Sequence, residues 1–245
     1  MTRAELLATL VGAGSHALEA PLSDWTASSR RFTDFLAANA SKIRKKLRHT
    51  PDEGGLLDLL LELETAYLLL REKALSLEFE PLKSAGGRSP DFAVSYTTAT
   101  TFMVEVTRLQ AAPWGAADQG RPPQPEPQAA ARFEDMLCRK LGQLHPGLPN
   151  VVIASVLGGT PEPDALDAAL TRLRLRAEAN DHRVVDTHGC RGRGDFLRRL
   201  ERLSAVMVRG AQPLSGAGGT LWLNAGARHP LPSKVRSALV RSHAS

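Results

Sequence analysis

The sequence predicts an α/β protein with a mixed central sheet flanked by helices, plus an N-terminal helical extension. A long apolar segment of helical length, residues 50–75, comes directly before three short runs rich in Phe, Val and Thr. A later helical stripe leads into the apolar run NVVIASVL, and further helix and strand patterns follow it. Because these elements must bury their apolar faces against one another, layers of helices on a sheet are expected.

Length and composition fit a protein with a substantial core. The chain has 245 residues, of which 42% are hydrophobic. We divide it into an N-terminal helical extension, residues 1–50, and an α/β domain, residues 51–245. No segment approaches the roughly 20 apolar residues of a membrane span. Cys138 and Cys190 are too few for a disulfide framework or a four-ligand zinc site. We therefore expect a soluble cytoplasmic protein that does not enter a membrane.

The N-terminal segment, residues 3–48, is expected to be helical because its apolar residues recur at helical spacing. It ends in the basic run SKIRKKLRH, which contains Lys42 and Lys46. We interpret this run as a solvated helix face, with a DNA contact as the alternative. Thr50 and Glu53 are spaced as a capping box for the next helix, which is apolar nearly all round and therefore central.

Three strands are predicted next, at residues 76–82, 89–96 and 100–109, as an antiparallel meander. Residues 111–130 are rich in Pro, Gln and Ala and are expected to form an exposed flexible loop. The stripe of residues 131–144 predicts a crossover helix that leads to a fourth strand at residues 150–157. Helices are then expected at residues 162–179 and 194–203, and strands at 204–210 and 220–226.

Two acids stand out in the second and third predicted strands. Asp91 begins the run DFAVSY, and Glu105 lies within FMVEVTR. Carboxylates on neighbouring strands repel each other, and their burial costs several kcal/mol unless a cation or a donor neutralises them. A hard divalent cation does this well. Strand alternation places Glu105 and Thr107 on the same face and turns Arg108 to the other.

This arrangement resembles the PD-(D/E)XK nuclease superfamily. The matching residues are Pro90-Asp91 and Glu105-Val106-Thr107, and the resemblance covers roughly residues 54–157. It implies a restriction-endonuclease-like α-β-β-β-α-β core. It also implies that Asp91 and Glu105 hold Mg²⁺, or Mn²⁺ in its place, with the backbone carbonyl of Val106 as a further ligand.

An auxiliary acid on the entry helix is common in this superfamily, and Glu62 stands where it would be expected, which implies that it is a further catalytic and metal-binding residue. The alternative is an ordinary exposed glutamate of the helix. Glu64 lies about 200° further round the helix and cannot share that face.

Thr107 departs from the family pattern, which has a lysine there to position the attacking water and to stabilise negative charge. A threonine supplies no such charge. Some members of the superfamily carry this lysine on the following helix, where the present chain has Lys140 with Gln143 one turn on. Lys140 is therefore a candidate catalytic cation, and a solvated helix lysine is the alternative.

The resemblance implies Mg²⁺-dependent hydrolysis of phosphodiester bonds, with DNA as the expected partner. The replacement of lysine by Thr107 leaves open a catalytically inactive protein of the same fold that binds nucleic acid or another protein. A metal-free structural protein is a third alternative. Oligomeric state stays open, and a homodimer is compatible with the sequence. The net charge of +5 suits a polyanion but is also that of an ordinary basic protein. Phosphate contacts, or plain surface charge, are expected at Arg172, Arg174, Arg176, Arg191, Arg193, Arg198, Arg199 and Arg202.

Overall fold

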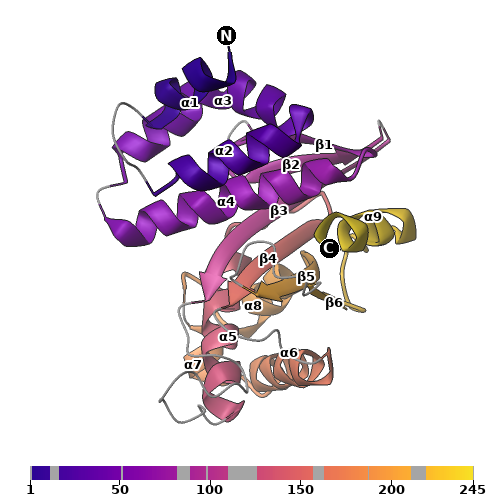
Figure 1. Ribbon diagram of the computed structural model, residues 1–245. Helices are drawn as coiled ribbons and strands as arrows, with labels where there is room; N and C mark the ends of the chain where they lie inside the picture. Colours follow the sequence, from indigo (N-terminus) through magenta and orange to yellow (C-terminus); the bar gives the residue numbers. More distant parts are fainter. Residues whose placement is uncertain are drawn as a thin grey trace.

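The computed structural model describes residues 2–11, 17–50, 52–81, 89–97, 99–109, 126–156, 163–186, 188–210 and 219–244, without the side chains of residues 126–129. Within these residues the protein is an α/β structure in which helices cover both faces of a mixed sheet (Figure 1). The coarse prediction of the fold class is thus confirmed. Among the described residues no helix combines the length and the apolar character that a membrane span needs.

The N-terminal segment forms α1 (Arg3–Val11), α2 (Glu19–Ser28) and α3 (Arg30–Arg48), so it is not one continuous helix. The break between α2 and α3 falls at Ser29, whose extended backbone places its side chain to accept the N–H of Phe32. Such a cap satisfies one of the free donors at a helix start. The division of the chain at residue 50 stays a prediction.

The central helix α4 (Glu53–Arg71) follows, and its cap differs from the one predicted. The N-cap is Asp52, whose carboxylate accepts the N–H of Gly55 at 2.7 Å. Thr50 instead donates its hydroxyl to the carbonyl of Lys46, 2.9 Å away in the last turn of α3. The predicted capping box of Thr50 and Glu53 is therefore wrong, because Asp52 stands directly at the helix start and takes that role.

The described strands form one sheet in the order β1-β2-β3-β4-β5-β6. Strands β1 (Leu75–Phe79), β2 (Phe92–Tyr96) and β3 (Thr100–Leu109) are antiparallel, which confirms the predicted meander. Strands β4 (Asn150–Val156) and β5 (Leu203–Gly210) continue the sheet in parallel with β3, and β6 (Thr220–Leu223) closes it antiparallel. The sheet is mixed, as predicted.

The remaining helices are α5 (Glu126–Leu141), α6 (Pro163–Glu178), α7 (His182–Val185), α8 (Arg193–Leu200) and α9 (Ser233–His243). Helix α5 begins earlier than predicted, so residues 126–130 are not part of a loop. Residues 110–125, which make up most of the predicted flexible loop, lie outside the described residues. Helix α9 was not predicted.

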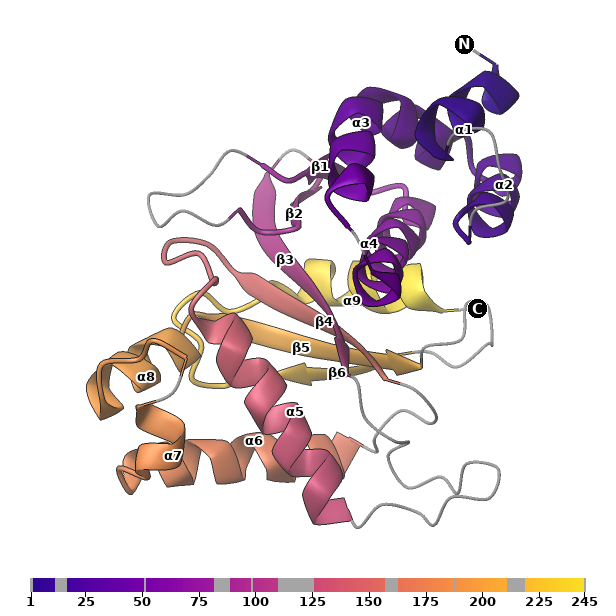
Figure 2. The ribbon, with the colours of Figure 1, turned by 90° about the vertical axis from the view of Figure 1, so that its left-hand side faces the viewer.

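Two hydrophobic cores lie on opposite faces of the sheet (Figure 2). The first core packs helices α1, α2, α3, α4 and α9 against one face of the sheet. Strand β3 contributes Phe102, Val104 and Val106 to it. The second joins α5, α6 and α8 to the other face. Because side chains alternate along β3, Glu105 is directed to the α5 side of the sheet and its neighbour Val106 to the α4 side. Strand β3 is thus held between two helical layers.

Candidate functional site

The candidate site lies where β2 ends and β3 continues. The described pairing of β2 with β3 runs from Thr100 to Val104 of β3, whereas β4 pairs with β3 from Met103 to Leu109. The second half of β3 therefore has its β4 edge paired and presents its other edge to the region next to Asp91. Backbone groups on such an edge need partners from outside the sheet ladder.

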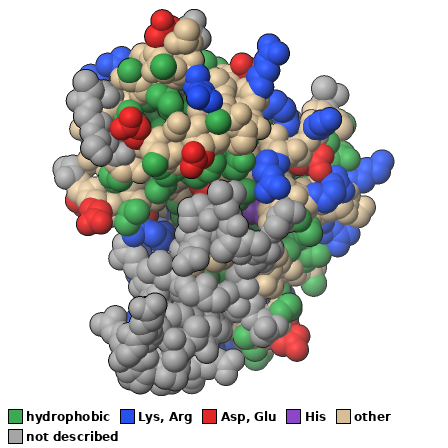
Figure 3. All heavy atoms as spheres, in the orientation of Figure 1, with side chains coloured by type: hydrophobic (Ala, Val, Ile, Leu, Met, Phe, Trp, Pro, Cys, Tyr) green, Lys and Arg blue, Asp and Glu red, His purple; other side chains and the backbone are tan. Residues whose placement is uncertain are grey.

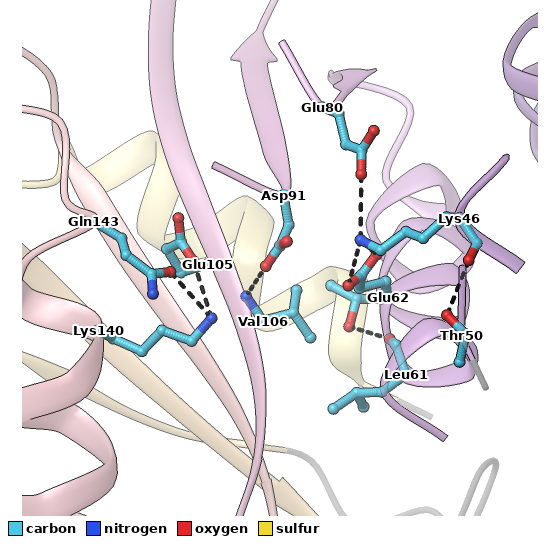
Figure 4. A network of polar contacts seen from close by, with 11 residues as sticks. Lys46, Thr50, Leu61, Glu62, Glu80, Asp91, Glu105, Val106, Lys140 and Gln143 are labelled. Carbon is cyan, nitrogen blue, oxygen red and sulfur yellow. Dashed lines mark hydrogen bonds and ion pairs between the residues drawn. The ribbon is translucent and has the colours of Figure 1, made fainter. Parts of the chain in front are cut away.

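Asp91 provides one of these partners. It lies one residue before β2, and its Oδ2 accepts the N–H of Val106 at 2.7 Å (Figure 4). In a strand the N–H and the C=O of one residue point to the same side. The carbonyl of Val106 is therefore directed to the edge at which Asp91 stands. The structure brings together Asp91 and Val106, two of the residues that the sequence selected as metal ligands.

Glu105 and Lys140 meet on the α5 side of β3. The Nζ of Lys140 lies 3.0 Å from Oε2 of Glu105 and 3.4 Å from Oε1 of Gln143. Glu105 is only 2% exposed, and this burial, with the nearby charge of Asp91, raises the pKa of Glu105 to about 7 although Lys140 opposes the rise. Lys140 is thus not a solvated helix lysine. It holds the charge of a carboxylate that would otherwise be buried alone.

Glu62 and Lys46 form a second ion pair on the α4 side. The Nζ of Lys46 contacts the two carboxylate oxygens of Glu62 at 2.8 and 2.6 Å, and it lies 3.3 Å from Oε1 of Glu80. Burial, with the charge of Asp91, raises the pKa of Glu62 to about 8, and Lys46 opposes the rise. Although burial disfavours its ammonium, the Glu62 carboxylate raises the pKa of Lys46. Glu62 is therefore buried rather than an exposed glutamate.

Lys46 corrects the interpretation of the basic run SKIRKKLRH as a purely solvated face. The side chain of Lys46 lies on the core side of α3, and Lys42 donates to the carbonyl of Phe79 at 2.6 Å. Lys46 stands three residues after the buried Ile43, so helical spacing turns both toward α4 and β1. This spacing was the signal in the sequence, and it was outweighed by the overall charge of the run.

A cavity of about 850 Å³ opens beside these groups. Its walls come from α4, from the second half of β3 and from one side of α5. Of the residues selected from the sequence, those that line it are Glu62, Asp91, Val106, Thr107, Lys140 and Gln143. Glu105 is absent from this lining but contacts Lys140. The structure therefore gathers these six predicted residues around one concave space.

Thr107 and Arg108 line the same cavity from opposite faces of β3. Thr107 shares the face of Glu105, as predicted, and carries no charge. Arg108 points to the α4 side, where its Nε lies 3.1 Å from Asp58 and its terminal nitrogen donates to the carbonyl of Gly54 at 3.0 Å. The predicted alternation thus holds, but the long side chain of Arg108 still reaches the cavity.

Glu64 lies apart from the site, in agreement with its predicted position on α4. It is 7% exposed and pairs with Arg209 of β5, whose terminal nitrogen is 2.5 Å from Oε2 of Glu64. This buried ion pair links α4 to the sheet on the side of α9. No local pattern predicts this pair, because the partners are 145 residues apart.

Most of the arginines considered for phosphate binding already have carboxylate partners. Arg172 and Arg176 both pair with the buried Glu134, which fastens α6 to α5. Three more arginines are paired within their own helix: Arg174 with Glu178, and Arg198 and Arg199 with Asp195. On the face shown in Figure 3, Lys and Arg side chains gather around the region of α9. The acids of α6 balance its arginines, whereas on α8 Arg198 and Arg199 share the single carboxylate of Asp195.

The donor set suits a hard cation in part. Asp91 and the Val106 carbonyl lie at one strand edge, and the Glu105 carboxylate, on the adjoining face, is near enough for its charge to interact with that of Asp91. Mg²⁺ is commonly held by one or two carboxylates, with water and substrate phosphate completing its shell. The mutual repulsion of Asp91 and Glu105 would be relieved by such an ion. Within the described residues, however, no group of three or more His, Cys, Asp and Glu side chains is arranged to hold a metal. A cation here would therefore be held by two protein carboxylates rather than by a complete protein cage.

Comparisons of the chain with models of protein families, with curated proteins and with solved structures give no match.

Proposed function

We propose that the protein is a Mg²⁺-dependent nuclease-like protein of restriction-endonuclease-like fold that hydrolyses phosphodiester bonds of DNA. The observation that carries this proposal is the position of Lys140, whose ammonium lies 3.0 Å from the Glu105 carboxylate on the same face as Thr107. A lysine from α5 thus supplies the charge that the strand itself lacks.

Each residue has a distinct role in this proposal. Asp91, Glu105 and the Val106 carbonyl hold the ion, which when bound supplies Lewis-acid activation of water and charge neutralisation at the phosphate. Glu62 provides an auxiliary acid on the α4 side, and Lys46 keeps that acid neutralised. Lys140 stabilises negative charge that develops on the scissile phosphate, and Gln143 fixes the direction of its ammonium. Thr107 lines the space in which water would stand.

The test combines metal binding with DNA cleavage. Titration calorimetry with Mn²⁺ is expected to show binding to the wild type and its loss in Asp91→Asn. Mg²⁺-dependent cleavage of DNA, supplied as a single strand and as a plasmid, is expected to be lost in the same variant. Glu201→Gln is the matched control, since Glu201 is exposed and lies away from the cavity. If the wild type and Glu105→Ala were equally inert and neither bound Mn²⁺, the catalytic proposal would be wrong.

A second candidate function is nucleic-acid or protein binding by a catalytically inactive protein of the same fold. The observation that favours it is that Glu62 and Glu105 are each already neutralised by a lysine, so that the folded chain is balanced without a metal. Salt-dependent DNA binding that persists in Asp91→Asn, without cleavage by the wild type, would select this function.

A further inference from the structure

One side of α5 lines the cavity along most of the described length of the helix. The residues on this side recur at spacings of three and four, which places them on a single stripe. They are Arg132, Asp135, Met136, Arg139 and Lys140, and Gln143 extends the stripe in the turn that follows α5. The stripe thus extends the site from Lys140 toward the N-terminal part of α5.

The positive charges around the cavity differ in how far they are already neutralised. Arg108 is paired with Asp58, and Arg139 with Asp135, which also contacts His188. Lys140 is paired with Glu105. Arg132 is exposed, and the part of the chain that the structure describes offers it no hydrogen bond or ion pair. Arg132 is therefore the guanidinium on this wall best able to meet an incoming anion.

The separation of Arg132 and Lys140 sets a length for that anion. The two residues are eight positions apart on one helix, which corresponds to about 12 Å along the helix axis. A stacked nucleic-acid strand advances about 3.4 Å per nucleotide. Two phosphates that meet Arg132 and Lys140 would thus be separated by about three or four nucleotides.

The size of the cavity argues for one strand. A volume of about 850 Å³ between α4 and α5 is that of a site which encloses a small ligand. It accommodates a short stretch of a single strand, whereas a double helix would have to stay outside the walls. In such sites arginine and lysine side chains bind a nucleic-acid strand through the phosphates of its backbone.

We propose that the α5 stripe is the binding track for a single nucleic-acid strand, and that Arg132 binds a backbone phosphate about three or four nucleotides from the one at Lys140. The proposal rests on the proposed function for the identity of the phosphate at Lys140. It assigns Arg132 to substrate positioning, in place of the paired arginines of α6 and α8.

The experiment measures binding separately from cleavage. Fluorescence anisotropy with a labelled oligothymidylate of about 16 nucleotides, in EDTA, gives the Kd at several salt concentrations. Arg132→Gln is expected to weaken binding roughly tenfold, as for one lost hydrogen bond to a charged group, and to lower the salt slope by about 0.7. Arg174→Gln is the matched control, because Arg174 is an exposed helix arginine that does not line the cavity.

A second measurement locates the phosphate. Uncharged methylphosphonate linkages are placed one at a time along the strand, and each is tested with the wild type and with Arg132→Gln. A methylphosphonate linkage that weakens binding by the wild type, but not binding by Arg132→Gln, marks the phosphate that Arg132 contacts. The expected result is a single such position, about three or four nucleotides from the position at which Lys140→Gln gives the same behaviour.

The outcomes separate this inference from the proposed nuclease. If the wild type cleaves DNA while Arg132→Gln keeps the wild-type Kd and salt slope, the track is wrong and the nuclease stands. If the wild type binds the single strand through Arg132 but cleaves nothing, the track stands and the nuclease is wrong. Binding to duplex DNA alone, or no binding to either form, would overturn the track.

Discussion

The ammonium of Lys140, on α5, lies 3.0 Å from Oε2 of Glu105, on β3. The two residues are 35 positions apart, and the segment between them includes residues 110–125. Strand alternation directs Glu105 to the α5 face, and helical spacing places Lys140 on the stripe that faces the cavity. The pair thus joins α5 to β3 on the face of the strand that Glu105 shares with Thr107.

The first prediction concerns the position of this positive charge. We expect Lys140→Gln to lower DNA cleavage by about 10²- to 10³-fold, as for the loss of one stabilising donor. Thr107→Lys in the Lys140→Gln background is expected to restore part of the activity, because Thr107 shares the face of Glu105 and lines the same cavity. Cleavage rates with saturating Mg²⁺ measure both effects.

Lys73→Gln is the control for this comparison, since Lys73 is exposed and does not line the cavity. A double variant as inactive as Lys140→Gln, with unchanged thermal stability, would show that a lysine at position 107 cannot replace Lys140.

The second prediction concerns Lys46 and Glu62. Lys46→Met leaves the Glu62 carboxylate buried without its partner, so we expect a loss of about 2 kcal/mol in the free energy of unfolding, less than for a fully buried pair because Lys46 is 28% exposed. The double variant Lys46→Met with Glu62→Gln is expected to recover most of that loss. Urea unfolding of the four proteins in the cycle gives the coupling energy.

Lys45→Met serves as the matched control, because Lys45 is the exposed neighbour of Lys46 on α3. Additive effects of Lys46→Met and Glu62→Gln would mean that the ion pair contributes nothing to stability.

The third prediction concerns the ion pair of Glu64 and Arg209, whose side chains are 9% and 6% exposed. Arg209→Met leaves a buried carboxylate uncompensated and is expected to cost about 3 to 5 kcal/mol, measured as the free energy of unfolding in urea. Replacing both partners, by Glu64→Leu with Arg209→Met, is expected to return stability close to that of the wild type. DNA cleavage by the double variant should be unchanged, since Glu64 lies outside the cavity. Reduced cleavage at wild-type stability would instead place Glu64 in the site.

Local periodicity made much of the site predictable. The alternation in FMVEVTR was enough to place Glu105 with Thr107 and to turn Val106 and Arg108 away. Lys140 and Gln143 were selected differently, through the resemblance to a superfamily in which some members carry the lysine on the following helix. The two faces of β3 follow from positions within one strand, so the sequence alone determines them, whereas the contact of Lys140 with Glu105 depends on how α5 packs on β3.

Partners that come from distant elements could not be predicted in the same way. The pairing of Lys46 with Glu62 depends on how α3 crosses α4, and that of Glu64 with Arg209 on how α4 lies over β5. No local pattern specifies either crossing. The helix α9 was missed for a related reason. Its apolar stripe is short, with Val235 and Leu239 buried one turn apart, and it is stabilised by packing on α4 rather than by its own sequence.

The last prediction concerns the buried His243 at the end of α9. Its imidazole is 7% exposed, and its Nδ1 lies 2.9 Å from the Ser242 hydroxyl and 3.1 Å from the carbonyl of Leu239. Burial lowers the pKa of His243 to about 4, and the charges of Arg209 and Arg71 act in the same direction. The folded protein therefore holds this histidine in its neutral form at pH values where the unfolded chain is already protonated.

The sign of the effect on stability follows from this difference. Between the ordinary pKa near 6.5 and about 4, the unfolded state binds a proton that the folded state does not, so stability falls as the pH is lowered through this interval. At about 1.4 kcal/mol per pKa unit, the loss amounts to about 3 kcal/mol. His243→Gln removes this titration while keeping groups that can form hydrogen bonds.

Urea unfolding at pH 7 and at pH 4 tests the prediction. The free energy of unfolding of His243→Gln relative to the wild type is expected to rise by about 3 kcal/mol between the two pH values, whereas the exposed His49→Gln should follow the wild type. The carboxylates of the protein titrate over the same pH range in the wild type and in both variants. Only the difference in the free energy of unfolding between His243→Gln and the wild type therefore reports on His243. A constant difference between His243→Gln and the wild type would mean that the imidazole of His243 becomes protonated in the folded protein as readily as in the unfolded chain.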